Sequence, residues 1–171
     1  MDDPVADVKH HARILHDAAT RGDEAALGRL RRLPELDALD DPSMRAAVRR
    51  RHCLAAVAKE LGFRSWPHAK AVLEGIETED LGELMHRTSG GAYWNIWSAS
   101  YDEATSIRRD HGGWLLAYRR QFLIVDEHFI EHLGLDPEDE DWARIGRDWV
   151  RPADRAAWTR LASRAVRARL A

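Results

Sequence analysis

The chain has 171 residues, of which 44% are hydrophobic and 32% charged, a balance typical of globular proteins and not of disordered ones. A formal net charge of −3 gives no overall attraction to nucleic acid or to an anionic membrane. The single cysteine excludes a disulfide within the chain, and neither a secretory leader nor an apolar stretch long enough to cross a bilayer is evident. We therefore expect a cytoplasmic protein, and its scarcity of lysine relative to arginine is typical of bacteria with GC-rich genomes.

The first 75 residues have the hydrophobic spacing of helices. Apolar side chains recur on one helical face over residues 4–21, and Gly22 follows as a stop. A short second helix is expected to begin after Asp23, which is a good N-cap. A longer helix is expected at roughly 44–61, and a last one opens at Pro67. These elements predict a helical bundle.

A change in composition separates this helical part from the rest of the chain. Residues 79–91 are first acidic and then rich in small, flexible residues, so we predict a linker between a helical domain 1–78 and a second domain 92–171. Strands are expected at 92–98, 114–118 and 122–125, an acidic turn at 136–141, and helices at about 102–110, 127–133 and from 152 onward. We predict an α+β fold, in which a helical N-terminal bundle is followed by a small mixed sheet packed with helices.

The segment RHCLAAVAKELGFRSWPHAKAVL, residues 51–73, joins two of the expected helices. Gly62 permits a left-handed turn, and Phe63 and Trp66 seal the two helices together. Within a stretch of about residues 10–75, the chain resembles bacterial ankyrin-repeat-type and glyoxalase-related proteins. The resemblance implies a helical accessory unit and supplies no catalytic residue, and the T-P-L-H signature of an ankyrin repeat is missing.

One motif predicts a metal-dependent hydrolase as an alternative function. Residues 128–132 read H-F-I-E-H, which matches the H-x-x-E-H pattern of inverted zinc hydrolases. His128 and His132 share a helical face and could both bind zinc, with Glu131 as the general base. A motif this short also arises by chance in an amphipathic helix. The candidates for the third ligand are Asp148, Asp154 and His111.

A second alternative is a DNA-binding helix-turn-helix at residues 54–73. Ala58 and Gly62 stand four apart, as tight packing before a turn requires, and a basic run at 45–51 precedes them. The second helix would present polar side chains to a DNA groove, namely Ser65, His68 and Lys70. The balance of acids and bases in residues 1–78 favours a structural helix pair instead.

The second half is rich in tryptophan, tyrosine and arginine. Strand alternation places Tyr93, Asn95 and Trp97 on one face and Trp94 on the other. A small sheet with one helix layer leaves one face uncovered, so aromatic rings there could line a ligand pocket or a partner surface. An arginine beside them could pair with a carboxylate or phosphate. The predicted binding residues are Trp97, Trp114, Tyr118, Arg119 and Arg120.

We therefore interpret the chain as a non-enzymatic bacterial binding module whose C-terminal half holds its partner on a Trp/Arg-lined face. A protein or a small-molecule ligand is the expected partner. Nucleic acid is an alternative partner, zinc is expected only in the hydrolase alternative, and no membrane association is expected.

Overall fold

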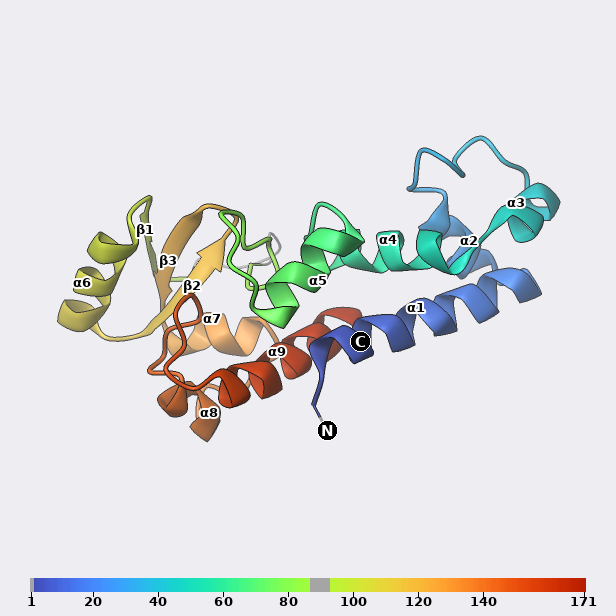
Figure 1. Ribbon diagram of the computed structural model, residues 1–171. Helices are drawn as coiled ribbons and strands as arrows, with labels where there is room; N and C mark the ends of the chain where they lie inside the picture. Colours follow the sequence, from blue (N-terminus) through green and yellow to red (C-terminus); the bar gives the residue numbers. More distant parts are fainter. Residues whose placement is uncertain (1, 87–92) are drawn as a thin grey trace.

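The computed structural model describes residues 2–86 and 93–171. Helices α1 to α5 form an elongated helical part, and a three-stranded sheet lies at the other end of the molecule (Figure 1). Residues 87–92, which include the end of the expected linker and the start of the first expected strand, lie outside the described residues. The helices of the first half are α1 (Pro4–Arg21), α2 (Glu24–Leu30), α3 (Asp41–Ala47), α4 (Arg50–Glu60) and α5 (Trp66–Glu74).

Polar side chains begin these helices and glycines end them, and at Gly22 and Asp23 they do so where the sequence predicts. The Asp23 carboxylate accepts a hydrogen bond from the Ala26 backbone N–H and caps α2, and the Ser65 hydroxyl accepts one from His68 and caps α5. Gly22 and Gly75 follow α1 and α5 in the left-handed conformation, with φ of 85° and 73°. Their backbone N–H groups donate to carbonyls of the preceding turn, as in other left-handed C-caps.

The helix expected at 44–61 is broken in two, and this corrects the sequence analysis. Val48 has an extended backbone, with φ of −59° and ψ of 136°, and ends α3. Its side chain is buried in the core. The Arg49 backbone N–H donates to the ring nitrogen Nδ1 of His52 over 3.1 Å, which satisfies a donor at the start of α4. Apolar spacing continues through the break because both segments bury their faces in the same core.

The second half confirms the α+β class. Tyr101–His111, expected as a helix, is capped by the Ser100 hydroxyl, which accepts from the Glu103 backbone N–H. The elements are β1 (Asn95–Ser98), α6 (Tyr101–His111), β2 (Trp114–Tyr118), β3 (Gln121–Val125), α7 (Glu127–His132), α8 (Glu140–Arg144) and α9 (Arg155–Leu170). Helix α8 begins inside the expected acidic turn, because Asp139 accepts from the Asp141 backbone N–H and caps it.

The strand order is β1-β3-β2, and both neighbouring pairs are antiparallel. We expected a mixed sheet because β1 and β2 flank a helix. These two strands do run in the same direction, but β3 lies between them, so their parallel relation forms no ladder. The one described parallel pairing outside the strands is an isolated bridge between Leu115 and Asp148.

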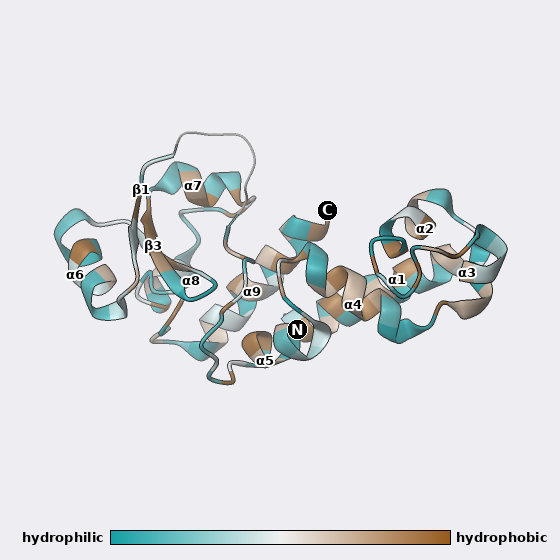
Figure 2. Ribbon diagram, turned by 90° about the horizontal axis from the view of Figure 1, so that it is seen from above, coloured by the Kyte–Doolittle hydropathy of each residue, from teal (hydrophilic) through white to brown (hydrophobic). Residues whose placement is uncertain are grey.

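Helices cover both faces of the sheet, although we expected a single layer. Leu115 and Ile124 pack with Ala104 of α6 on one face. Leu116 and Leu123 lie on the other face and belong to the main core. Figure 2 shows α6 on one side of the sheet and α8 and α9 on the other, with hydrophobic residues along β3 between them. Helix α8, missed from the sequence, packs on α9 and contacts Trp114 of β2 through Trp142.

The edge strand β1 is the least covered part of the sheet. In β2 the first four residues are buried, whereas in β1 only Ser98 is. Trp94 and Trp97 are therefore 45% and 41% exposed. A solvent-facing indole on an edge strand is available for a ligand or partner.

Helix α9 lies along α1 and joins the two halves (Figure 1). The Ser163 hydroxyl of α9 donates to the Asp7 carboxylate of α1, and Arg167 pairs with the same carboxylate over 3.1 Å. One hydrophobic core runs from α1 to α9. The division into domains at residues 79–91 stays a prediction, and α9 crosses it. No helix in the described residues is long and apolar enough to span a membrane.

Candidate functional site

The structure brings together three of the five predicted binding residues, Trp97, Tyr118 and Arg119. The ring centroids of Trp97 and Tyr118 are 5.5 Å apart in an edge-to-face arrangement, and the Arg119 guanidinium carbon lies 5.4 Å from the Tyr118 centroid. The His86 ring lies 4.6 Å from that of Tyr118, and burial lowers the pKa of His86. The other two predicted residues are not part of this cluster: Trp114 lines a different pocket, and Arg120 pairs with Glu79.

Both arginines of the β2–β3 turn are already paired within the chain. Arg119 binds Glu83 with a nitrogen–oxygen distance of 2.5 Å, and Arg120 binds Glu79 over 3.2 Å. The Arg119 backbone N–H donates to the Gly82 carbonyl over 2.7 Å, and its carbonyl accepts from Leu81. These contacts tie residues 79–83 to the hairpin, so the arginines act first as structural residues.

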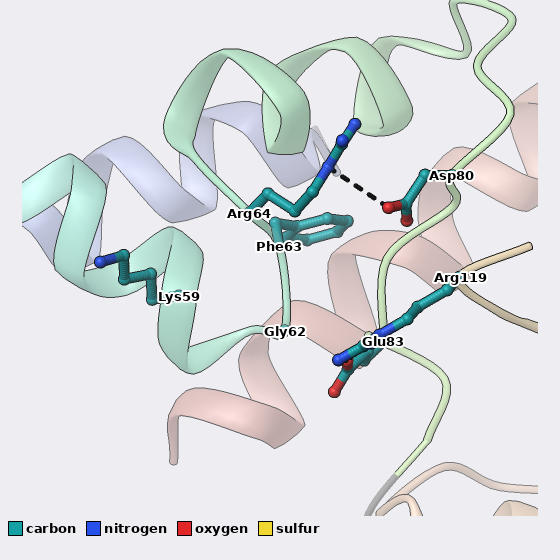
Figure 3. Close-up of a pocket in the computed structure, with 7 residues that line it drawn as sticks. All are labelled: Lys59, Gly62, Phe63, Arg64, Asp80, Glu83 and Arg119. Carbon is teal, nitrogen blue, oxygen red and sulfur yellow. Dashed lines mark hydrogen bonds and ion pairs between the residues drawn. The ribbon is translucent and has the colours of Figure 1, made fainter.

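A pocket of about 330 Å³ lies beside this hairpin (Figure 3). Figure 3 shows Arg64 reaching toward Asp80, with a distance of 3.3 Å, and Arg119 lying alongside Glu83. The Nε2 of His68 is 2.7 Å from the Asp80 carbonyl and holds that segment in place. Each arginine lining this pocket has an acidic partner, and among its lining side chains only Lys59 carries a charge without an ion pair in the described residues.

A second pocket, of about 380 Å³, lies between the two halves. The Tyr101 hydroxyl donates to Asp148 over 2.5 Å, and Arg151 stacks on the Tyr101 ring at 4.0 Å. Burial and this hydrogen bond raise the pKa of Tyr101, so the phenol is held as a protonated donor. The other Asp148 oxygen accepts from the Val150 and Arg151 backbone N–H groups. The polar groups around Asp148 are thus used to join elements.

The third pocket, of about 460 Å³, is larger than these two and lies at the opposite end of the sheet from the hairpin. We call it the sheet-end pocket. It is built where β1 and β2 begin, β3 ends and α6 ends. Trp94, His111 and Trp114 supply its aromatic walls, and Asp126, Glu138 and Arg147 supply charge. Its volume lies within the range of small-molecule sites.

Trp114 and Arg147 form the inner wall of the sheet-end pocket. Trp114 is 6% exposed, and its indole Nε1 is buried without a hydrogen-bond partner in the described part of the chain. Buried donors without an acceptor are rare in folded proteins and costly. The Arg147 guanidinium carbon lies 4.5 Å from the centroid of the Trp114 ring, in a cation–π contact. Of the predicted binding residues, Trp114 alone lines this pocket.

Arg147 is held in an unusual backbone conformation. Its φ is +52°, a left-handed value that is rare for residues other than glycine. Its backbone N–H donates to the Trp142 carbonyl and its carbonyl accepts from Leu115, over 2.7 and 2.9 Å. Strain of this kind persists where the surroundings fix it, and often at functional sites. These two bonds fix the backbone from which the side chain reaches Trp114.

Sequence reasoning missed Trp94 and Arg147 as site residues. Trp94 was expected within the first strand but lies just before β1, and its ring lies 6.3 Å from that of His111 at the end of α6. Arg147 follows Gly146, whose left-handed conformation ends α8. A glycine after a short amphipathic segment is the signal that would have revealed this turn, but it does not predict which ring the next side chain meets.

The H-x-x-E-H residues do not form a metal site in the described structure. His128 and Glu131, the expected ligand and base, are both exposed and lie 3.3 Å from each other, and this hydrogen bond raises the pKa of His128. His132 stacks against Tyr93 at 4.8 Å. In residues 2–86 and 93–171, no three His, Cys, Asp or Glu side chains are grouped to hold a metal ion. Asp148 and Asp154, two candidate third ligands, bond Tyr101 and cap α9.

The side chains expected to enter a DNA groove are used within the fold. His68 is buried, with its Nδ1 accepting from the Arg64 backbone N–H over 3.2 Å. Ser65 caps α5, and Lys70 lies 3.6 Å from Glu74 on the same helix. The α4–α5 pair therefore has the turn of a helix-turn-helix, but its second helix offers few free donors to a base edge.

No known protein family, curated protein or solved structure matches the chain. The resemblance of residues 10–75 to ankyrin-repeat-type and glyoxalase-related proteins therefore stays a prediction.

Proposed function

We propose that the protein is a binding module that holds a small-molecule ligand in the sheet-end pocket. The observation that carries the proposal is the pairing of an exposed indole, Trp94, with a buried indole, Trp114, across a pocket of about 460 Å³. Concave sites with aromatic walls and a few fixed polar groups are the usual form of small-molecule sites. This retains the Trp/Arg-lined face expected from the sequence, with Arg147 in place of the hairpin arginines.

The position of the pocket supports the proposal. Its residues stand at the ends of strands and helices that the hydrophobic core holds in place, and sites on such elements are more precise than sites on free loops. Gly113 brings the start of β2 so close to β3 that an added Cβ would lie 2.4 Å from the Val125 carbonyl oxygen. The Trp114 indole is therefore carried by a strand that lies very close to its neighbour β3.

The test uses the indole N–H signals of the seven tryptophans in two-dimensional proton–nitrogen NMR spectra. Each signal is assigned by one Trp→Phe substitution, and the protein is then titrated with a library of small amines, carboxylates and neutral compounds. We expect at least one compound to move the Trp94 and Trp114 signals together while leaving that of Trp97 in place.

Trp97→Ala is the matched control for Trp94→Ala. Both rings stand on or next to β1 and have nearly equal exposure, but only Trp94 lines the pocket. Binding should be lost in Trp94→Ala and kept in Trp97→Ala. If no compound in the library moves the two signals, or if binding survives Trp94→Ala unchanged, the pocket is not the ligand site.

A further inference from the structure

We propose that the sheet-end pocket recognises a small organic cation, of the protonated-amine or quaternary-ammonium class. The inference rests on the proposed function, because it names the ligand class of the same pocket. Three independent features carry it: unpaired acids, an open indole and a cation that the chain itself already places on the other indole.

The first feature is the charge of the pocket. Three carboxylates line it, those of Asp126, Glu127 and Glu138, against a single arginine, Arg147. None of these four side chains has an ion-pair partner in the described part of the chain. By contrast, Glu60, Glu83 and Asp141 elsewhere all bind arginines. Asp126 also caps α7 by accepting the Phe129 backbone N–H, and His128 lines the pocket, paired with Glu131. The pocket still carries more acidic than basic side chains without an ion-pair partner, and such a field attracts a cation.

The second feature is the indole of Trp94. Its ring is 45% exposed, and no arginine or lysine stacks on it in the described residues, although Arg147 stacks on Trp114 in the same pocket. The face of an indole carries negative potential and is the best aromatic surface for a cation. Trp94 thus offers an unused surface of this kind next to the unpaired carboxylates.

The third feature is Arg147 itself, which shows that the pocket accepts a cation on an aromatic face. Its guanidinium carbon lies 4.5 Å from the Trp114 centroid, and its strained backbone is anchored to Trp142 and Leu115. A bound cation on Trp94 would be repelled by this fixed charge and attracted by the three carboxylates. Removing Arg147 should therefore strengthen cation binding, whereas removing a carboxylate should weaken it.

Three probes of the same shape separate charge from size. Choline carries a positive nitrogen where 3,3-dimethylbutan-1-ol carries a neutral carbon, and 3,3-dimethylbutanoate has the same branched end with a negative carboxylate. Titrated into the protein at low salt, choline should move the Trp94 indole signal, and the neutral and anionic isosteres should do so at least about fivefold more weakly. The difference in affinity between choline and its isosteres should narrow in high salt, because dissolved ions screen the charge of the carboxylates.

Charge substitutions supply the second arm. Glu138→Gln should weaken choline binding by about two- to fivefold, and Arg147→Gln should strengthen it by a similar factor. Trp94→Ala should abolish it. Glu140→Gln is the matched control, because Glu140 is an exposed acid that pairs with Arg144 on α8 and does not line the pocket. Thermal melts and the unperturbed Trp97 signal show that each variant is folded.

The outcomes separate this inference from the proposed function. If the anionic isostere binds better, or if Glu138→Gln and Arg147→Gln change choline affinity with the opposite signs, the pocket stands as a ligand site but not for cations. If choline binds with the same affinity as the neutral isostere, charge recognition is excluded and only shape remains. If neither these probes nor any library compound moves Trp94 and Trp114, both proposals fall.

Discussion

At the hairpin end of the sheet, Arg119 and Arg120 each pair with a glutamate, whereas at the opposite end three carboxylates and Arg147 have no ion-pair partner in the described residues. The hairpin end is closed by a segment that binds it through backbone hydrogen bonds. The other end is an open pocket with an exposed indole. Charged side chains thus stabilise the fold at the hairpin end and remain available for a ligand at the other end. The two ends differ in whether these side chains are paired within the chain, and not in the types of residue present.

The largest change in stability is expected from Gly113→Ala, at the pocket end of the sheet. Gly113 has φ of +85°, and an added Cβ would meet the Val125 carbonyl oxygen at 2.4 Å. Left-handed strain and a clash with backbone together should cost about 3–4 kcal/mol of unfolding free energy. Chemical denaturation of wild type and variant measures this difference in unfolding free energy. Gly146→Ala is the control, because its φ is +71° with no neighbour within 4 Å, so it should cost only about 1 kcal/mol. Equal costs at the two positions would exclude the close strand approach.

A smaller effect is expected at Asp141, which holds the pocket wall to the rest of the protein. This buried carboxylate of α8 binds Arg160 and Arg164 of α9, with distances of 2.5 and 2.9 Å. Asp141→Asn leaves Arg160 without an acidic partner in the described residues, while Arg164 keeps Asp139 at 2.7 Å. It should therefore lower the unfolding free energy by about 2–3 kcal/mol. Glu140→Asn, at an exposed neighbour, should change it far less.

The same carboxylate gives a dependence on pH with a defined sign. Hydrogen bonds from Arg160, followed by those from Arg164, lower the pKa of Asp141 to about 2. Because the folded pKa lies below the unfolded value of about 3.9, its stabilising contribution is complete above that value. The contribution is lost as the pH falls from about 4 to about 2. The stability difference between wild type and Asp141→Asn should shrink over that window; a difference that stays constant down to pH 2 would contradict the assignment.

The smallest effect is expected at the hairpin end, from Arg119→Ala. Arg119 is exposed and Glu83 only half-buried, and ion pairs open to solvent contribute little to stability. The backbone bonds to Gly82 and Leu81 remain in the variant. Thermal unfolding should therefore shift only slightly, and Arg120→Ala should shift it no more. A large loss of thermal stability in Arg119→Ala would mean that the hairpin end depends on this ion pair and not on its backbone hydrogen bonds.

The sequence predicts individual elements better than their arrangement. Local chemistry marks helix ends, so Gly22 ends α1 and Asp23 begins α2 as expected. It does not reveal the break at Val48, because the apolar spacing continues through it. The sequence also does not reveal that β3 is the central strand. The short hairpin shows that β2 and β3 are neighbours, but it does not show on which side of them β1 lies. Helix α8 was missed because an acidic run was interpreted as a turn, although Asp139 is a good N-cap.

The candidate site was predicted in kind but not in place. Trp114 is the first residue of β2 and Arg119 directly follows its last, so the sequence groups them as neighbours. A five-residue strand nevertheless places them roughly 15 Å apart, at opposite ends of the sheet. Alternation predicts the face of a side chain and gives no position for a pocket. The contact of Arg147 with Trp114 joins residues 33 positions apart through a backbone conformation that no residue type other than glycine would indicate.

The packing of α9 along α1 has a consequence for how the chain acquires its structure during synthesis. Helix α1 leaves the ribosome early, but Ser163 and Arg167, its partners on α9, are made only after the sheet. Until then Asp7 and the surface around it stay in contact with water or with chaperones. Contacts between residues this distant in sequence close late and slow the final step of folding. The nascent helical half should therefore be sensitive to proteases until α9 emerges and docks.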